Sequence, residues 1–580
     1  MFKAFIRMIL LIGISVPVQA QVDWKAWSAE SFALAKAEDK PIFLYLEAVW
    51  CHWCHVMQRR TLGDPQVQTL IARHFVPVRV DHDANPGLAN RYRDYGWPAI
   101  IFLDADGEDL VKRAGYIAPA GFSRLLKAVA EDPTPEPAAT QTQAANGPSE
   151  LPRALVDYLE RRHQKSFDPV KGGLRTKQKF VDRHSMEYAL SHVHKAAERD
   201  KLTKTLDAAT ALLDPVWGGV YQYSTGGDWR TPHHEKIMRV QAGYLRVYAL
   251  ADQALKTFQY KGVSARIIDY LFEFLRAPEA AFYVSQDADL IPGEKSADYF
   301  RLDDRQRRAA GIPAIDRSIY ADANGQAIEA LALAYSVYGD PAMLDAAIQA
   351  ARWITRHRLS PQGLMQHGEK SDTFHLSDSL HMAISLLRLY EVTGERQWFV
   401  LSRRLADAMI TGFGSEQAGY LTKQLVQGIP QRPAPYLQEN IRMTRFFNRL
   451  WHYSGDARHR QAALHGMKYL SAWTARKVAF EEAGILLANE ELSRDPPHLT
   501  IVGAKSDEMA QRLFAVAISN AAAVYRRVEW WDPEQEPLPN HDVTYPRFER
   551  AAGYICTNQR CSRPSFSPED YQVQIKRLSN

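Results

Sequence analysis

The chain has 580 residues, more than one ordinary hydrophobic core can organise, so we expect at least two domains. Hydrophobic residues make up 46% and charged residues 24%, a composition that excludes disorder on a large scale. The formal net charge is only +4, and lysine and arginine are spread along the chain. The sequence therefore gives no indication of nucleic-acid binding.

The N-terminus has the pattern of a secretory signal. Lys3 and Arg7 precede a short apolar stretch at 8–16, and Val18-Gln19-Ala20 fits a cleavage site. We interpret residues 1–20 as a cleavable signal peptide, with an uncleaved anchor as the alternative. The stretch is too short to span a bilayer, and no later segment is long and apolar enough. We expect a periplasmic or secreted protein without stable membrane insertion, in a compartment where disulfides persist.

Residues 21–130 alternate strand-like and helix-like patterns, which predicts a small α/β domain. The continuous apolar run Ile42–Leu46 is typical of a buried central strand. The other expected elements are a helix from the first cysteine pair to Leu62, a helix from Asp64 to His74, a strand at 76–80, a hairpin of 99–103 with 111–116, and a helix at 121–130.

Residues 131–150 are rich in Pro, Ala, Thr and Gln, which predicts a linker. From 151 to 580 the chain reads as helices separated by two alternating kinds of glycine turn. One kind is Gly-acid after a helix, at 339, 394 and 455, and the other is Gly-apolar, at 363, 419 and 484. This alternation predicts stacked helical hairpins, roughly six at about 60–70 residues each, that close into an (α/α) toroid with a C-terminal cysteine tail.

The sequence Trp50-Cys51-His52-Trp53-Cys54-His55 directly follows the buried strand. The first cysteine should therefore lie at a helix N-terminus, where amide hydrogens and the helix dipole favour the thiolate. We predict that Cys51 is an exposed nucleophile and that Cys54 resolves the mixed disulfide. Pro98, after Gly96-Trp97, is placed where thioredoxin-like folds have a cis-proline beside the disulfide. Residues 21–130 are thus predicted to be a thioredoxin-like domain.

The segment Cys51–Met57 resembles the redox segment of the spermatogenesis-associated protein 20-like thioredoxin-domain family. Similar family segments are found at 232–238, 285–289, 323–325 and in the pair Cys556 and Cys561. The resemblance implies a thioredoxin fold joined to a six-hairpin, glycosidase-like toroid. The chain departs from the family pattern in two ways: Arg239 and Val240 occupy the stretch of a usual acid, and Ala323 replaces a tryptophan.

The position that usually holds the proton acceptor of the redox pair differs in this chain. Thioredoxins place a buried acid six residues before the first cysteine, where this chain has Tyr45. Glu47 lies two residues further along the same strand face and is our candidate. Trp50, Trp53 and Trp97 flank the pair and are candidate substrate contacts.

Three other interpretations of the cysteine motif remain open. It is also the C-x-x-C-H pattern of covalent haem attachment, its cysteines and histidines could bind zinc, and the disulfide could be purely structural. The preceding strand and Pro98 favour redox chemistry, so we predict neither a cofactor nor a metal ion. Cys556 and Cys561 are expected to form a disulfide on the C-terminal tail, with a relay to the first pair as the alternative.

The helical domain is expected to carry a concave site at one rim of its hairpins. The candidate polar residues are His233, His234, Glu235, Asp287, Asp289 and Asn324, with aromatic faces from 217–229 and further carboxylates at Asp322 and Glu439. Asp287 and Asp289 alternate on one loop expected to be exposed, so one should point inward.

Two functions remain open at this point. One is a thiol-disulfide oxidoreductase that acts on protein thiols or a redox partner and recruits substrate through its toroid. The other is a carbohydrate-active or sugar-binding toroid with an accessory thioredoxin-like domain. Because the usual acid is missing after Lys236, we expect sugar binding without efficient hydrolysis.

Overall fold

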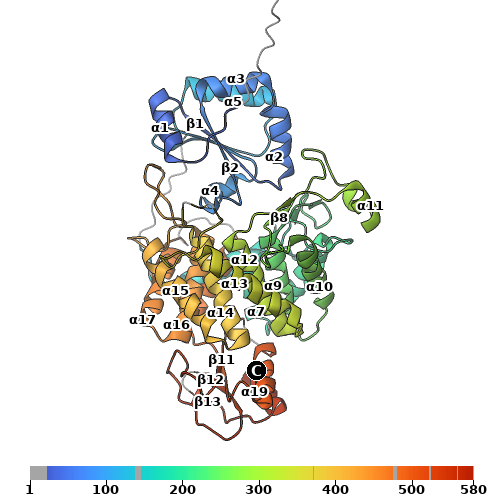
Figure 1. Cartoon of the computed structure of the whole chain (residues 1–580), viewed down its shortest axis with the longest axis vertical. Coiled ribbons are helices and arrows are strands. Elements are labelled where there is room, and N and C mark those ends of the chain that lie inside the picture. The colour runs from blue at the N-terminus through green and yellow to red at the C-terminus, as the bar shows by residue number, and fades with distance from the viewer. Residues whose placement is uncertain are drawn as a thin grey trace, which may run out of the picture.

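The computed structural model describes residues 22–136, 146–369, 371, 373–473, 480–520, 524–557 and 560–578. The predicted signal peptide, 1–20, and the middle of the predicted linker, 137–145, lie outside the described residues. Figure 1 shows a small α/β domain at one end, a helical ring in the middle and a second small sheet at the other end. Within the described ranges, no helix combines the length and apolarity needed to cross a bilayer.

The N-terminal domain is a four-stranded sheet in the order β2-β1-β3-β4. β1 pairs parallel with β2 and antiparallel with β3, and all of its residues are buried, as the apolar run predicts. The strands are β1 (Ile42–Glu47), β2 (Val76–Asp81), β3 (Ala99–Leu103) and β4 (Asp109–Ala114). The helices are α1 (Ala29–Glu38), α2 (His52–Val56), which continues as a π-helical turn at Met57–Thr61, α3 (Pro65–His74), α4 (Pro86–Tyr92) and α5 (Pro119–Glu131).

This arrangement confirms the thioredoxin-like fold. The sequence pattern did not predict α1 or α4. α1 buries only Ser31, Phe32 and Ala35, so its apolar periodicity is weak. α4 is a short helix that begins at the Asn85 cap and Pro86.

Six of the described helices form the inner wall of the ring, and each contacts the next. They are α7 (Arg183–Ser191), α9 (Met238–Leu255), α12 (Ala321–Tyr338), α14 (Leu376–Thr393), α16 (Leu437–Ser454) and α18 (Glu482–Ser493). α18 also packs on α7, so the ring is closed. The outer partners, in the same order, are α8 (Ala196–Ala209), α10 (Lys261–Tyr270), α13 (Pro341–Arg358), α15 (Arg396–Phe413), α17 (Ala457–Trp473) and α6 (Arg153–Ser166). The predicted six-hairpin toroid is confirmed.

The predicted Gly-acid turns end three of the inner helices. Gly339, Gly394 and Gly455 follow α12, α14 and α16 with φ of 75°, 68° and 67°, a left-handed conformation that glycine adopts without steric cost. The loops at the opposite end of the ring hold short elements: β5 (Tyr223–Ser224), β6 (Pro232–His233), β7 (Lys236–Ile237), β8 (Ser285–Gln286), β9 (Ile315–Asp316) and α11 (Asp304–Ala310). Single 3₁₀ or π turns lie at 93–95, 210–212, 271–275 and 299–301.

The C-terminal region departs from the expected run of helices to residue 580. After α18 the chain forms a four-stranded sheet in the order β11-β10-β12-β13. Its elements are β10 (His498–Val502), α19 (Glu508–Ser519), β11 (Arg527–Trp531), β12 (Ala552–Thr557), β13 (Arg560–Cys561) and α20 (Pro568–Leu578). β10 is buried throughout, and periodicity cannot separate such a short buried strand from a helical segment. Cys556 and Cys561 form a disulfide between β12 and β13.

The packing of α12 on α14 generates a stability prediction. A Cβ added at Gly325 would lie 2.6 Å from the backbone carbon of His381, so Gly325→Ala must push the two helices apart. We expect a loss of about 1–3 kcal/mol, seen as a lower thermal unfolding midpoint. Gly262→Ala in α10 is the control, because no described atom outside the adjacent backbone of the same helix lies within 4 Å of its added Cβ. An equal loss in both variants would contradict the close helix contact.

Candidate functional site

The redox pair lies where β1 leads into α2, as predicted. Cys51 is the N-cap of α2, and its sulfur accepts a hydrogen bond from the amide of Cys54 at 3.2 Å. The two residues are joined in a disulfide with a Cα–Cα distance of 5.3 Å. The bond between Trp97 and Pro98 is cis. The strand, cysteine pair, helix and cis-proline thus have the arrangement that the sequence indicated.

The exposure predicted for Cys51 is wrong for this structure. Cys51 is 4% exposed, and Cys54 is completely buried. Trp50 from the same loop and Ile237 and Val240 from the helical ring pack around the disulfide. The ring therefore shields the sulfur atoms from bulk solvent, a long-range contact that a local sequence motif does not show.

Glu47 does not contact the cysteines. Arg79 Nε donates to its carboxylate at 2.5 Å, and Gln58 donates a second hydrogen bond. The side chain of β1 that reaches the pair is Tyr45, whose hydroxyl donates to the carbonyl oxygen of Cys54 at 3.1 Å. Glu47 is thus held by other partners, and Tyr45 occupies the place beneath the pair.

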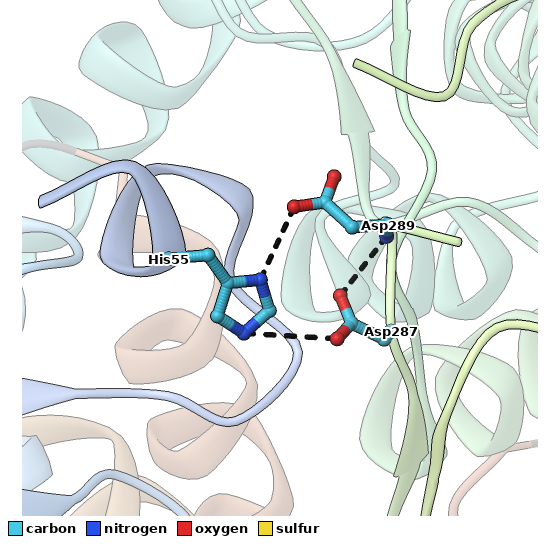
Figure 2. Close-up of side chains that lie close together, drawn as sticks. All are labelled: His55, Asp287 and Asp289. Atoms are coloured by element: carbon cyan, nitrogen blue, oxygen red, sulfur yellow. Dashed lines mark hydrogen bonds and ion pairs between the residues drawn. The ribbon is translucent and has the colours of Figure 1, made fainter. Parts of the chain in front are cut away.

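The two histidines of the cysteine motif connect the domains. His52 Nδ1 lies 2.7 Å from Asp289 Oδ1, and His55 Nδ1 lies 3.1 Å from Asp289 Oδ2. His55 Nε2 lies 3.6 Å from Asp287 Oδ2. Figure 2 shows the imidazole of His55 between the two carboxylates, and the amide of Asp289 donates to Asp287. We call these four side chains the latch.

The latch corrects the expectation for the Asp287–Asp289 loop. Both carboxylates are buried, and both face the thioredoxin-like domain instead of a ligand. Burial favours neutral His55, but the Asp289 hydrogen bond and both carboxylate charges outweigh it and raise the pKa of His55. Burial raises the pKa of Asp289, but bonds from His52 and His55 bring it below the ordinary value. A charged histidine–aspartate pair is the state that these shifts favour.

A second contact lies at α4 and the loop before it. Asn90 donates from Nδ2 to Glu439 Oε1 in α16 at 2.9 Å. His367 of the ring donates from Nε2 to the carbonyl oxygen of Asp83 at 2.6 Å. The thioredoxin-like domain thus covers the face of the ring at which the inner helices begin, as Figure 1 shows.

A cavity of about 500 Å³ lies between the two domains, and we call it the chamber. Trp50, Cys51, Trp53 and Trp97 line it from the thioredoxin-like domain. From the ring, the lining includes His233, Glu235, Arg239, Tyr320, Asp322, His381, Glu439 and Arg442. The three tryptophans predicted to flank a substrate therefore face the chamber. Cys51 lines it as well, whereas Cys54 does not.

The predicted polar residues of the ring separate into two groups. His233 and Glu235 line the chamber, whereas His234 stacks on Phe300 at 4.3 Å outside it. Asn324 holds the backbone of Phe282, accepting from its amide and donating to its carbonyl oxygen. In the aromatic stretch, Gln222 and Tyr223 line the chamber, but Trp217 and Trp229 donate to Asp304 and Lys171 elsewhere.

Two carboxyl groups in the chamber have raised pKa values. Burial raises the pKa of Glu439 to about 8. The charge of Arg442 acts to lower this pKa, and the charge of Asp322 acts to raise it. Burial also raises the pKa of Asp322 to about 6, against the charge of His367. They come from the first turns of α16 and α12, which the ring brings to one chamber. At neutral pH, Glu439 is a proton donor and Asp322 an anion.

Sequence reasoning missed Tyr320, His381 and Arg442 as chamber residues, because no local motif marks them. Arg239 also lines the chamber, and in the sequence it stands out only as a departure from the family pattern. Two groups have ligand atoms within 4.8 Å of one another, as a metal ion requires: His55, Asp287 and Asp289, and Asp322, His367 and Asp378. In both groups the histidine is already hydrogen-bonded to a carboxylate.

Comparisons with known proteins agree with both domains. Residues 15–146 match the family model Thioredox_DsbH, described as "Protein of unknown function, DUF255". Residues 317–465 match "Beta-L-arabinofuranosidase, GH127 catalytic domain". Spermatogenesis-associated protein 20 of Homo sapiens is 26% identical over 310 residues, 47% of this chain and 39% of that protein. The chain is a relative of spermatogenesis-associated protein 20. The resemblance seen in the motifs is thereby confirmed, although the alignment spans about two fifths of the human protein's length.

Further relatives match single domains. "Disulfide bond reductase DsbH" of Chlamydia pneumoniae is 29% identical over 120 residues, 19% of this chain and 71% of that protein. Among solved structures, D-mannose isomerase is 12% identical with a TM-score of 0.46 and covers 59% of this chain and 98% of its own. Cellobiose 2-epimerase from Bacillus thermoamylovorans is 11% identical with a TM-score of 0.44, over 56% of this chain and 88% of its own.

The latch generates a prediction about access to the redox pair. Asp289→Asn removes the charge that holds His52 and His55, and a hydrogen bond to a charged group contributes about 1.5–3 kcal/mol. We expect the domains to separate more often and iodoacetamide to alkylate reduced Cys51 about tenfold faster or more.

Asp298→Asn is the matched control, because Asp298 is exposed and pairs only with Arg301 on the surface. Its alkylation rate should equal that of the unchanged protein. Equal rates in all three proteins would show that the latch does not control access to Cys51.

Proposed function

We propose that this protein is a thiol-disulfide oxidoreductase whose redox pair acts on a small molecule held in the chamber. The observation that carries the proposal is the position of Cys51, which lines the chamber and is shielded from bulk solvent. A small ligand in the chamber can reach this sulfur directly. A folded protein can reach it only after the domains separate.

The local geometry supports exchange chemistry at Cys51. After reduction, the helix N-terminus and the hydrogen bond from the amide of Cys54 stabilise a thiolate at Cys51. Cys54 lies behind it, beside the hydroxyl of Tyr45, in the position of the resolving thiol. Similarity of the first domain to a protein named a disulfide bond reductase also supports this assignment.

Export is part of the proposal. The basic residues Lys3 and Arg7, the short apolar stretch and the site at Ala20 support a periplasmic or secreted location. In such a compartment the pair would need a redox partner to renew it after each cycle. That partner, or any protein thiol substrate, would have to engage the open form.

Disulfides of two sizes test this function. The reduced protein should react with 2-hydroxyethyl disulfide and react slowly with insulin, because the buried Cys51 is within reach of a small molecule in the chamber but not of a folded protein. Asp289→Asn, which weakens the latch, should raise the rate with insulin and leave the small disulfide nearly unchanged. Cys51→Ser should abolish both reactions, and Cys54→Ser should trap mixed disulfides. Rapid insulin reduction by the unchanged protein would contradict the proposal.

A second function is favoured by Glu439 and Asp322. A protonated acid and a carboxylate in one chamber are the pair that glycoside chemistry uses, and residues 317–465 match a glycosidase catalytic domain. The thioredoxin-like domain would then be an accessory that closes the chamber. The missing acid at Val240 weighs against efficient hydrolysis, so this function ranks second.

The pKa values make the second function testable. Any turnover of an arabinofuranoside or another glycan should have a bell-shaped pH profile with limbs near 6 and 8. Turnover should fall about 100-fold or more in Glu439→Gln, because the general acid is lost. Glu369→Gln is a control, because Glu369 is exposed and is not among the chamber-lining residues. Turnover that survives Glu439→Gln would exclude this pair as the catalytic groups.

A further inference from the structure

One guanidinium group of the chamber, that of Arg239, makes no hydrogen bond or ion pair among the described residues. Arg239, in the first turn of α9, lines the chamber, and its side chain is exposed to it. The guanidinium nevertheless lies deep inside the molecule, and burial is the main cause of its lowered pKa. Among the described residues, no hydrogen bond or ion pair involves it. The charge therefore faces the chamber without a bound partner.

Two arginines deeper in the ring, Arg246 and Arg183, are neutralised by carboxylates. Arg246 donates to Glu187 at 2.9 Å and to Glu329 at 2.7 Å, and Arg183 pairs with the same two carboxylates. Asp83 and Asp322 are close enough to act on the charge of Arg239, but Asp83 already accepts hydrogen bonds from His82 and Trp50. Arg239 differs from Arg246 and Arg183 in that no hydrogen bond or ion pair to a carboxylate is found for it among the described residues.

The surroundings of Arg239 favour an anion. Arg93 from the thioredoxin-like domain also lines the chamber, and its charge lowers the pKa of Arg239 further. The inner helices α9, α12, α14 and α16 begin at the chamber, and helix N-termini carry partial positive charge. Arginine binds carboxylates with paired hydrogen bonds. An anionic group in the chamber could therefore form charge-assisted hydrogen bonds with Arg239.

Arg239 is also close in sequence to the residues that pack on the disulfide. Ile237 and Val240 belong to the apolar cluster around Cys51 and Cys54. The cation and the reactive sulfur therefore line one cavity of about 500 Å³, within the usual range of about 300–1,000 Å³ for small-ligand sites. Both groups therefore border the space that one small ligand would occupy.

We propose that the chamber binds a low-molecular-weight thiol or disulfide that carries a carboxylate, with the carboxylate on Arg239 and the sulfur at Cys51. This inference rests on the proposed function and adds the class of ligand to it. Arg239 is a binding residue in this scheme, and Cys51 is the catalytic residue.

The exchange balances without another reactant. The thiolate of one ligand attacks Cys51 Sγ, so a ligand–Cys51 disulfide forms and the Cys51–Cys54 bond breaks. The electron pair of that bond goes to Cys54, whose thiolate takes up a proton. A second ligand thiolate attacks the sulfur of the bound ligand and releases Cys51 as a thiolate. Two ligand thiols are thereby oxidised to one disulfide, and the protein disulfide is reduced to the dithiol.

The test uses the full chain in its oxidised form with glutathione and its diethyl ester, which have the same thiol but differ in carboxylate charge. We expect glutathione to reduce the Cys51–Cys54 bond about tenfold faster than the ester, as one charge-assisted hydrogen bond predicts. In R239Q, glutathione and the ester should react at similar rates, because the partner of the carboxylate is lost. R239K, which retains the charge, should keep part of the preference.

Binding provides a readout that needs no exchange. S-methylglutathione, which cannot react with the disulfide, should bind the unchanged protein in calorimetry and should bind R239Q about tenfold more weakly. R356Q is the control, because Arg356 is an exposed residue of α13 outside the chamber lining. It should behave as the unchanged protein does, and thermal unfolding identifies any variant that fails to fold.

The outcomes separate this inference from the function on which it rests. Equal rates with glutathione and its ester, or the same preference in R239Q, would overturn the role of Arg239 and leave the proposed function intact. Exchange with neither compound in the unchanged protein would overturn the proposed function. Binding of glucuronate but not of S-methylglutathione would overturn the thiol assignment in favour of an acidic sugar.

Discussion

The contact between the cysteine motif and the ring determines what the rest of the structure can do. His52 and His55, placed on one face of α2 by the same helix that positions the cysteines, meet Asp289 and Asp287 of the ring. The pairing removes charged groups from water, so it holds only while each charge has its partner. With the latch closed, the disulfide lies against Ile237, and Cys51 lines the chamber. A redox motif that is usually a surface feature becomes one wall of a small-molecule site.

The ring supplies the other walls through its topology. A closed set of inner helices brings their first turns to one face, and each turn adds a polar side chain at a different point of the circle. Asp322 and Glu439 are separated by more than 100 residues, yet their shared burial raises both pKa values. Deeper in the ring, Arg246 forms ion pairs with Glu187 and Glu329. Arg246 and Glu329 also line the chamber. Residues of both domains therefore line the chamber.

The sequence was sufficient for the thioredoxin-like fold class, the helical ring and the local redox geometry. The buried run at Ile42–Leu46, the cysteine spacing, Pro98 and the Gly-acid turns each act over a few residues, so local chemistry determined them. The chamber was only partly predictable. The exposure of Cys51, the partners of Asp287 and Asp289 and the free charge of Arg239 all depend on how two distant segments dock. The C-terminal sheet was missed because its short buried strands carry no distinctive period.

The central claim is that Cys51 reacts inside the closed chamber. The most direct measurement is a crystal structure of the full chain with Cys54→Ser, trapped as the mixed disulfide of Cys51 with 2-mercaptoethanol. We predict that the bound thiol lies in the chamber near Trp97 and Tyr320, with His52 and His55 still on their aspartates. A structure in which the domains are apart and the modified Cys51 faces bulk solvent would contradict the account.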